Sequence, residues 1–165
     1  MLSVRRLQIG QGELLRAIRL ASLREAPYAF FSTVAIEQAR SLASWCEQAD
    51  ASAEGPDRST CIAFWGDTPI GIAALYRHPE GTDTGKILHA WVAPEHRHRG
   101  VGTALLVALF RWAAANGFRL IRATVAKENP GAIQFYRTVG FAPADDPACD
   151  PAGRPIFMKA VAPAP

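Results

Sequence analysis

The 165-residue sequence contains no apolar run that approaches the roughly 20 residues needed by a membrane-spanning helix. The segment Met1–Leu7 carries Arg5 and Arg6 where a signal peptide would need an apolar core. Cysteine is scarce: Cys46, Cys61 and Cys149 are odd in number and lack the spacing of metal ligands. We therefore predict a cytoplasmic protein with reduced thiols, no metal ion and no membrane partner.

A strong excess of one charge is also missing, because 18 lysine and arginine residues are offset by 15 aspartate and glutamate residues. The arginines are spread along the chain, which is typical of a solvated surface and not of a nucleic-acid interface. The sequence also lacks the Gly-x-x-x-x-Gly-Lys-Ser/Thr run, and Gly100-Val101-Gly102 lacks the third glycine of a dinucleotide fingerprint. We therefore expect no nucleic-acid partner, and neither nucleotide-binding motif is present.

The hydrophobic content of 49% is sufficient for one domain with a sizeable core. Hydrophobic periodicity and turn residues predict elements in the order β-α-α-β-β-β-α-β-α-β-β. A polar connection is expected at 50–59 and turns at 66–69 and 79–85. We expect strands at 4–9, 60–65, 70–77, 86–92, 120–125, 141–143 and 155–160, and helices at 13–25, 35–48, 102–116 and 130–139.

Short turns between consecutive strands predict antiparallel pairing, whereas the crossover through the helix at 102–116 predicts one parallel pair. The expected fold class is α/β of the α+β type, with a mixed, mostly antiparallel sheet. We expect one domain over residues 1–161 and a flexible tail at 162–165.

The segment from Trp91 to Thr103 joins the end of a strand to the start of a buried helix through a basic, glycine-bearing turn. The first N–H groups of a helix lack partners, and the helix dipole favours negative charge there. Gly100 and Gly102 let the backbone approach a ligand, while Arg97 and Arg99 add positive charge. The turn is therefore a candidate anion site.

A second pattern follows the next strand: Asn129-x-x-Ala132-x-x-Phe135-Tyr136-x-x-x-Gly140-Phe141. Together with Arg97-x-x-Gly100-x-Gly102, in this order of strands and helices, it resembles the GNAT family of acetyl-CoA-dependent N-acetyltransferases. The resemblance covers nearly the whole chain. It implies a single-domain GNAT-like fold in which the strands at 86–92 and 120–125 splay apart, with helices on both faces of the sheet.

The resemblance also implies acetyl-CoA as cosubstrate and assigns residues to it. Backbone of Trp91 and Val92 would pair with the pantetheine arm, Asn129 would touch that arm, and Tyr136 would lie beside the sulfur. The pyrophosphate would be held by backbone N–H groups of His98, Arg99, Gly100, Val101, Gly102 and Thr103. Asn129 as a simple helix N-cap and Tyr136 as a core tyrosine are the structural alternatives.

The chemistry of acetyl transfer suits these residue types. An N–H group near Val92 could stabilise the negative charge that develops on the thioester oxygen. A phenol, with a reference pKa of about 10, stays protonated at neutral pH, so Tyr136 can protonate a departing thiolate. Many family members carry a glutamate on the strand before the turn, but this strand has Lys86 and His89 instead. His89, Glu37 and a base acting through water are the candidate bases, and a structural role for His89 is the alternative.

We expect direct transfer in a ternary complex to the primary amine of a small molecule or peptide. The alternative is a non-catalytic CoA-binding or regulatory module on the same fold, and a homodimer is possible for proteins of this kind. The residues do not specify the acceptor. The aromatic residues Tyr28, Phe30, Phe31 and Trp45 are expected to belong to the core more than to a substrate wall.

Overall fold

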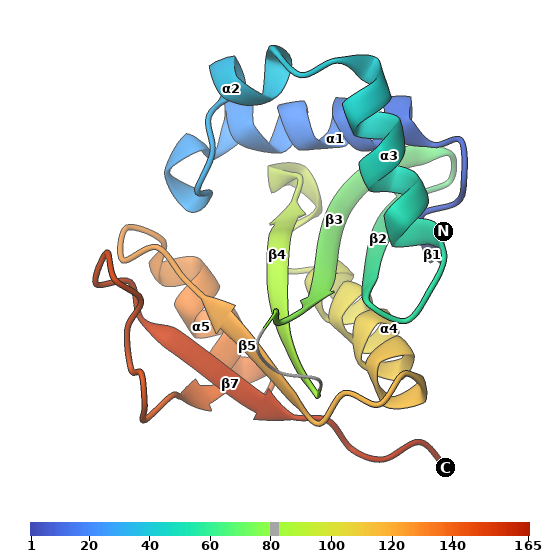
Figure 1. The fold of residues 1–165 in the computed structure, drawn as a ribbon. Helices are drawn as coiled ribbons and strands as arrows, with labels where there is room; N and C mark the ends of the chain where they lie inside the picture. The colour runs from blue at the N-terminus through green and yellow to red at the C-terminus, as the bar shows by residue number, and fades with distance from the viewer. Residues whose placement is uncertain (80–82) are drawn as a thin grey trace.

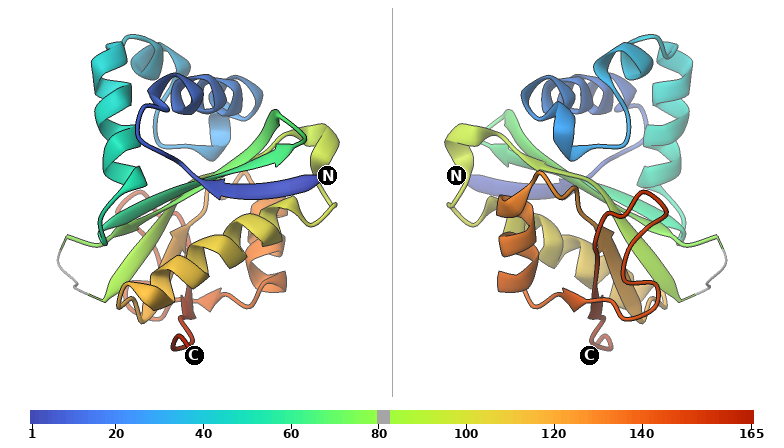
Figure 2. Two further views of the ribbon diagram at one scale, coloured as in Figure 1. Left: turned by 90° about the vertical axis from the view of Figure 1, so that its right-hand side faces the viewer. Right: turned by 90° about the vertical axis from the view of Figure 1, so that its left-hand side faces the viewer.

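A seven-stranded mixed sheet lies between two layers of helices in a computed structural model that describes residues 1–79 and 83–165. Helices α1, α2 and α3 cover one face of the sheet, and α4 and α5 cover the other (Figure 1; Figure 2). The strand order is β1-β2-β3-β4-β5-β7-β6, and β4 with β5 is the parallel pair. The predicted fold class is thereby confirmed.

The strands are mostly antiparallel, and two 3₁₀ turns occur, one between α1 and α2 and one between β4 and α4. The strands are β1 Leu2–Arg6, β2 Arg58–Trp65, β3 Thr68–Arg77, β4 Thr84–Val92, β5 Leu120–Thr124, β6 Ala142–Pro143 and β7 Ile156–Ala160. The helices are α1 Gly12–Glu25, η1 Pro27–Ala29, α2 Val34–Gln38, α3 Leu42–Ala53, η2 Pro94–His96, α4 Val101–Ala115 and α5 Pro130–Thr138. The expected turn at 79–85 falls partly on residues 80–82, which lie outside the described residues.

The prediction of one helix over 35–48 is wrong, because two helices with separate N-caps occupy this region. The Thr33 hydroxyl accepts a hydrogen bond from the N–H of Ile36, and the Ser41 hydroxyl accepts one from the N–H of Ser44. Helix α2 ends at Gln38, and Ser41, with extended backbone, then starts α3. Helix α3 then continues to Ala53, into the segment expected to be a polar connection.

The pairing of β4 determines the shape of the sheet. Its parallel contact with β5 covers only three residue pairs, Thr84–Lys86 with Leu120–Arg122, and the two strands then diverge. On its other side, β4 places His89 and Ala90 opposite the single residue Ala73 of β3. This irregularity is a β-bulge, and His89 adopts φ 61° within it. The expected splaying of these two strands is therefore present.

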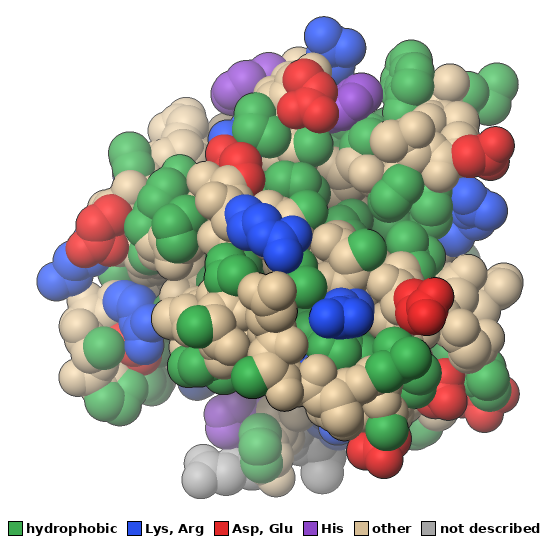
Figure 3. All heavy atoms as spheres, turned by 90° about the horizontal axis from the view of Figure 1, so that it is seen from above, with side chains coloured by type: hydrophobic (Ala, Val, Ile, Leu, Met, Phe, Trp, Pro, Cys, Tyr) green, Lys and Arg blue, Asp and Glu red, His purple; other side chains and the backbone are tan. Residues whose placement is uncertain are grey.

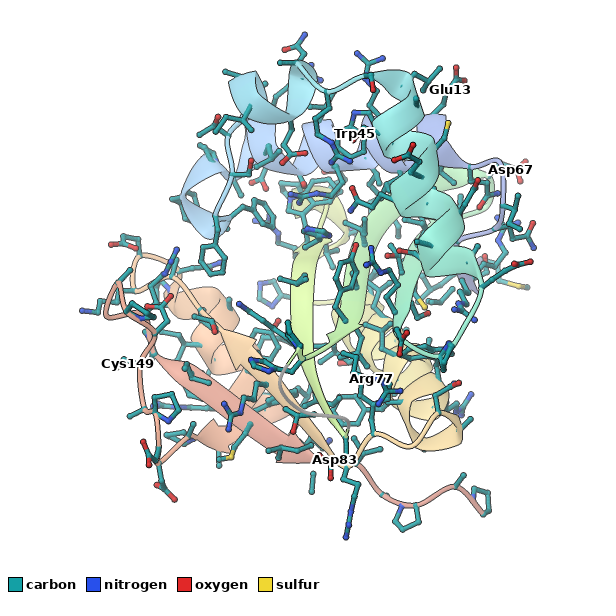
Figure 4. All side chains as sticks on the ribbon, viewed as in Figure 1. Glu13, Trp45, Asp67, Arg77, Asp83 and Cys149 are labelled. Atoms are coloured by element: carbon teal, nitrogen blue, oxygen red, sulfur yellow. The ribbon has the colours of Figure 1, made fainter. Side chains whose placement is uncertain are left out.

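Each face of the sheet has its own core. Trp45 of α3 is fully buried between α1, α3 and the sheet (Figure 4), together with Leu15, Ile18 and Ile72. On the other face, a larger cluster contains Leu105, Leu109, Ile121, Tyr136 and Phe141. No helix within residues 1–79 and 83–165 is long and apolar enough to cross a membrane.

The surface of the helical layer carries mixed side chains (Figure 3), and the cysteines are free. Seen from above, acidic, basic and apolar side chains are interspersed over the helical layer, as on a solvated surface (Figure 3). All three cysteines are unpaired: Cys61 is buried, Cys46 is half-buried, and Cys149 is exposed on the loop before β7 (Figure 4).

The close approach of α1 to α3 makes Gly12 sensitive to substitution. A Cβ on Gly12 would lie 2.7 Å from the Cα and 2.8 Å from the N of Cys46, so one helix would have to move. We expect Gly12→Ala to lower the free energy of unfolding by about 1 to 3 kcal/mol, measured by urea denaturation. Gly131→Ala is the matched control, because it adds a methyl group near the start of α5, where the nearest atom is 3.9 Å away. A control variant destabilised as much as Gly12→Ala would contradict this explanation.

Candidate functional site

The turn between β4 and α4 presents a row of unpaired backbone donors. His98 and Gly100 have φ of 58° and 81°, and α4 begins directly after Gly100. The N–H groups from His98 to Thr103 make no hydrogen bond to any described residue. A left-handed residue within such a turn directs successive N–H groups toward one side, which forms an anion-binding concavity at a helix N-terminus. Arg99 and Thr103 are exposed beside it.

The two glycines of this turn serve different purposes. A Cβ on Gly100 would meet no atom within 4 Å, so Gly100 is required for its backbone conformation and not for space. A Cβ on Gly102 would lie 3.1 Å from the Phe135 ring, so the missing side chain lets α5 pack against α4. The two sequence motifs therefore touch each other through Gly102 and Phe135.

A carboxylate from the distant helix α1 holds the turn in place. The Arg97 guanidinium pairs with Glu25 at 2.6 Å and donates to the carbonyl oxygen of Val92 at 2.9 Å. The Trp91 indole N–H donates to the same Glu25 oxygen at 2.7 Å. The charge of Arg97 is thus matched by Glu25, and Arg99 is the arginine of this turn that stays without such a partner among the described residues. Sequence reasoning missed Glu25, because 66 residues separate it from Trp91.

Val92 offers an N–H group on the diverging side of β4. The N–H of Ala93 donates to the carbonyl of Ile70 on β3 at 2.8 Å. Because residues of an antiparallel ladder alternate in direction, the N–H of Val92 points away from β3. On that side β5 has already diverged from β4, since their pairing ends at Lys86. Val92 thus presents a backbone donor to the opening between the strands.

Asn129 and Tyr136 lie on α5, which follows β5. The Asn129 side chain caps α5 by accepting a hydrogen bond from the N–H of Ala132 at 3.2 Å. The Tyr136 ring packs against Phe135 and Phe141, with centroid separations of 5.5 and 5.1 Å, and is 6% exposed. Burial raises the pKa of Tyr136 well above its ordinary value, so the phenol stays protonated at neutral pH.

A cavity of about 550 Å³ lies between the helical layer of α1–α3 and strands β2–β4. It brings together two of the candidate bases, His89 from the β4 bulge and Glu37 from α2. Its charged and aromatic lining residues include Arg19, Glu37, Arg40, Arg58, Tyr76 and His89.

The two candidate bases differ in their surroundings. Burial, and then the charges of Arg19 and Arg40, lower the pKa of His89 to about 3, so its imidazole is neutral at neutral pH. Partial burial would raise the pKa of Glu37, but hydrogen bonds from Arg40 and Ser32 outweigh it and leave that pKa below its ordinary value. Both side chains are therefore in their proton-accepting form at neutral pH, and His89 is a weak base.

The aromatic residues expected in the core are divided between two roles. Trp45 is part of the core, as predicted. Tyr28 and Phe31 are 51% and 48% exposed, so for them the prediction is wrong. The Phe31 ring instead lies 3.7 Å from the guanidinium of Arg154, and the Phe30 ring lies 5.0 Å from that of Arg19. Cation–π contact takes the place of apolar packing at this loop.

Comparison with known proteins identifies a matching family, sequence relatives and similar solved structures. A sequence model of the acetyltransferase (GNAT) family matches residues 18–141. An uncharacterized N-acetyltransferase of Methanocaldococcus jannaschii is 39% identical over 77 residues, which cover 44% of this chain and 34% of that relative. The match thus spans about a third of the length of that curated relative.

Two solved structures share the fold over almost their whole length. An acetyltransferase of the GNAT family from Streptococcus pneumoniae matches with a TM-score of 0.79 and 19% identity, over 98% of this chain and 100% of that one. The PaiA N-acetyltransferase from Thermoplasma acidophilum, solved in complex with coenzyme A, matches with a TM-score of 0.75 and 19% identity. That match covers 97% of this chain and 99% of that one.

The low pKa of His89 makes a prediction about stability. Between pH 6.5 and 3 the unfolded chain binds a proton at His89 that the folded chain does not, so this residue costs stability as the pH falls. We expect the wild type to lose about 2 kcal/mol more than His89→Asn between pH 7 and pH 5, measured by urea denaturation. Asparagine tolerates the positive φ at this position.

His98→Asn is the matched control, because His98 is exposed and also has positive φ. It should keep the pH dependence of the wild type. Equal losses in the wild type and His89→Asn would show that His89 is not held neutral by its surroundings.

Proposed function

Because this chain belongs to the acetyltransferase (GNAT) family, we propose that it transfers an acetyl group from acetyl-CoA directly to a primary amine in a ternary complex. One observation carries the proposal: a row of unpaired N–H groups starts α4 at the mouth of the opening between β4 and β5. An acyl thioester with a pyrophosphate at its other end fits both features. The acceptor is a small-molecule or peptide amine.

The residues at this opening fit acetyl-CoA, which supplies the activated acetyl group when bound. The N–H groups of His98–Thr103 would hold the pyrophosphate, and Arg99 would add positive charge. Backbone of Trp91 and Val92 would pair with the amides of the pantetheine arm, as an added strand would. Asn129 lies at the start of α5 on the other side of the opening.

The chain's own groups then serve the transfer. The N–H of Val92 would donate to the thioester oxygen as negative charge develops there. Tyr136, kept as a phenol by burial, would give its proton to the departing sulfur. Its hydroxyl makes no hydrogen bond to any described residue, which leaves the proton available.

The incoming amine must lose a proton before it attacks. His89, Glu37 and water in the cavity are the groups that could accept it, and both side chains line the same cavity. Burial, and then the charges of Arg19 and Arg40, keep His89 neutral, and both effects act in the same direction on a bound ammonium group, because burial and like charges favour its neutral form. A weak base therefore suffices in this cavity.

The proposed anion site at the start of α4 can be tested by introducing a negative charge there. Thr103 is exposed in the first turn of α4, where an acidic side chain is favourable for the helix itself. We expect Thr103→Glu to keep or raise the melting temperature but to weaken acetyl-CoA binding by roughly 10-fold or more, measured by calorimetry. Thr103→Gln, of nearly the same size and without charge, should bind acetyl-CoA much more like the wild type. Undiminished affinity in Thr103→Glu would argue against a pyrophosphate at this turn.

The role of Tyr136 can be tested by removing its hydroxyl. Tyr136→Phe preserves the ring contacts with Phe135 and Phe141, so folding and acetyl-CoA affinity should change little. We expect kcat to fall by roughly 100-fold, the usual scale for loss of a positioned proton donor. An acetyl thioester of a more acidic thiol should restore part of the rate, because its sulfur needs less protonation.

Tyr28→Phe removes an exposed tyrosine hydroxyl and is the control. A Tyr136→Phe variant with the wild-type chemical step would make Tyr136 a core residue only. Acetyl-CoA binding without turnover of any amine would favour the non-catalytic module.

A further inference from the structure

The cavity between α1–α3 and strands β2–β4 contains a buried cation with no carboxylate in direct contact, and the charge of Glu37 acts on it only from a longer distance. Arg19 of α1 lines this cavity and is only 3% exposed. Its guanidinium donates one hydrogen bond, to the Ser22 hydroxyl at 3.3 Å, and lies over the Phe30 ring. No carboxylate oxygen of the described residues comes within 4.0 Å of it. A buried charge without a paired opposite charge costs folding free energy, so binding of an anion from outside the chain would be favourable here.

The neighbouring charges are already used within the protein. Arg40 pairs with Glu37 at 2.8 Å and donates to Gln48 at 2.8 Å. Glu37 accepts a second hydrogen bond from Ser32 at 2.8 Å. This pair is therefore neutral overall and fully engaged, and Glu37 is not in contact with Arg19.

The remaining charged residues leave the cavity positive. Arg58 from β2 lies over the Tyr76 ring, with its guanidinium carbon 4.6 Å from the ring centroid. Glu47 is the other carboxylate of the lining, and it is exposed at the solvent side. An acceptor that brought only ammonium groups would add positive charge beside Arg19. An acceptor that also brought an anion would balance it.

We propose that the acceptor is an amine that also carries a carboxylate, as an amino acid does, and that Arg19 binds this carboxylate. The inference rests on the proposed acetyl transfer and names its acceptor class. A guanidinium and a carboxylate match in geometry and can form two parallel hydrogen bonds. With the carboxylate at Arg19, the amine can extend toward the β4 bulge at Leu88 and His89, which line the same cavity. There it meets the opening where the thioester is proposed to lie.

The test compares acceptors that differ only in the carboxylate. L-lysine and cadaverine, L-ornithine and putrescine, and β-alanine and ethylamine form three such pairs. Release of free CoA from acetyl-CoA gives kcat/KM for each amine. We expect the wild type to favour the carboxylate-bearing member of at least one pair by about 10- to 100-fold, the usual effect of a hydrogen-bonded charge pair.

Variants on one helix assign this preference to Arg19. Arg19→Met keeps the length of the side chain and removes its charge, so the preference should disappear through a raised KM for the amino acid. Arg19→Lys keeps the charge without the planar fork and should retain part of the preference. Arg24→Met removes one charge from the exposed side of α1 and should behave as the wild type. Calorimetric binding of acetyl-CoA shows that each variant is folded.

Equal rates within every pair would overturn the inference, as would a preference that survives in Arg19→Met. A wild-type protein that binds acetyl-CoA but acetylates none of the three amino acids would also overturn it, while the acetyl-CoA site would stand. A wild-type protein that does not bind acetyl-CoA would overturn the proposed function itself.

Discussion

The short parallel contact between β4 and β5 is the constraint on which the rest of this structure depends. After three residue pairs the strands separate, and the N–H group of Val92 has no β5 residue to pair with. Contacts with helices fix the end of β4 and the turn after it: Glu25 ties Trp91 and Arg97 to α1, and Phe135 of α5 packs on Gly102 of α4. Helices cover both faces of the sheet, so the opening lies between two packed layers (Figure 2).

Two sites in the protein favour a bound anion, and their positive potential has different sources. At the start of α4 the positive potential comes from backbone N–H groups and the helix dipole, with no buried ionised side chain. In the cavity under α1–α3 it comes from a guanidinium that is almost wholly removed from water. Burial lowers the pKa of Arg19 to about 10, which still leaves it charged at neutral pH. His89 lies in the same cavity, where burial and the charge of Arg19 help to keep its imidazole neutral.

The local sequence was sufficient for most of the elements. The apolar runs of β2 and β3, the glycine before α4 and the asparagine before α5 act within a few residues, and they predict these elements closely. The prediction of one helix at 35–48 was wrong because the Ser41 hydroxyl accepts a hydrogen bond from the N–H of Ser44 and starts a new helix. Apolar periodicity alone does not reveal that capping competition, since both halves have helical patterns. Phe31 was expected in the core but is exposed, because its ring contacts the cations of Lys86 and Arg154 on distant elements.

By itself, the sequence predicted the order of most helices and strands along the chain, the single parallel crossover and the glycine turn that starts α4. These features follow from backbone rules that act over a few residues of the chain. Only the tertiary structure decided that Glu25 anchors the turn, that His89 and Glu37 share a cavity, and that Arg19 is buried there with no carboxylate of the described residues in contact. Each of those facts depends on side chains brought together across the two layers, and no spacing along the chain encodes such distances or the loss of water around them.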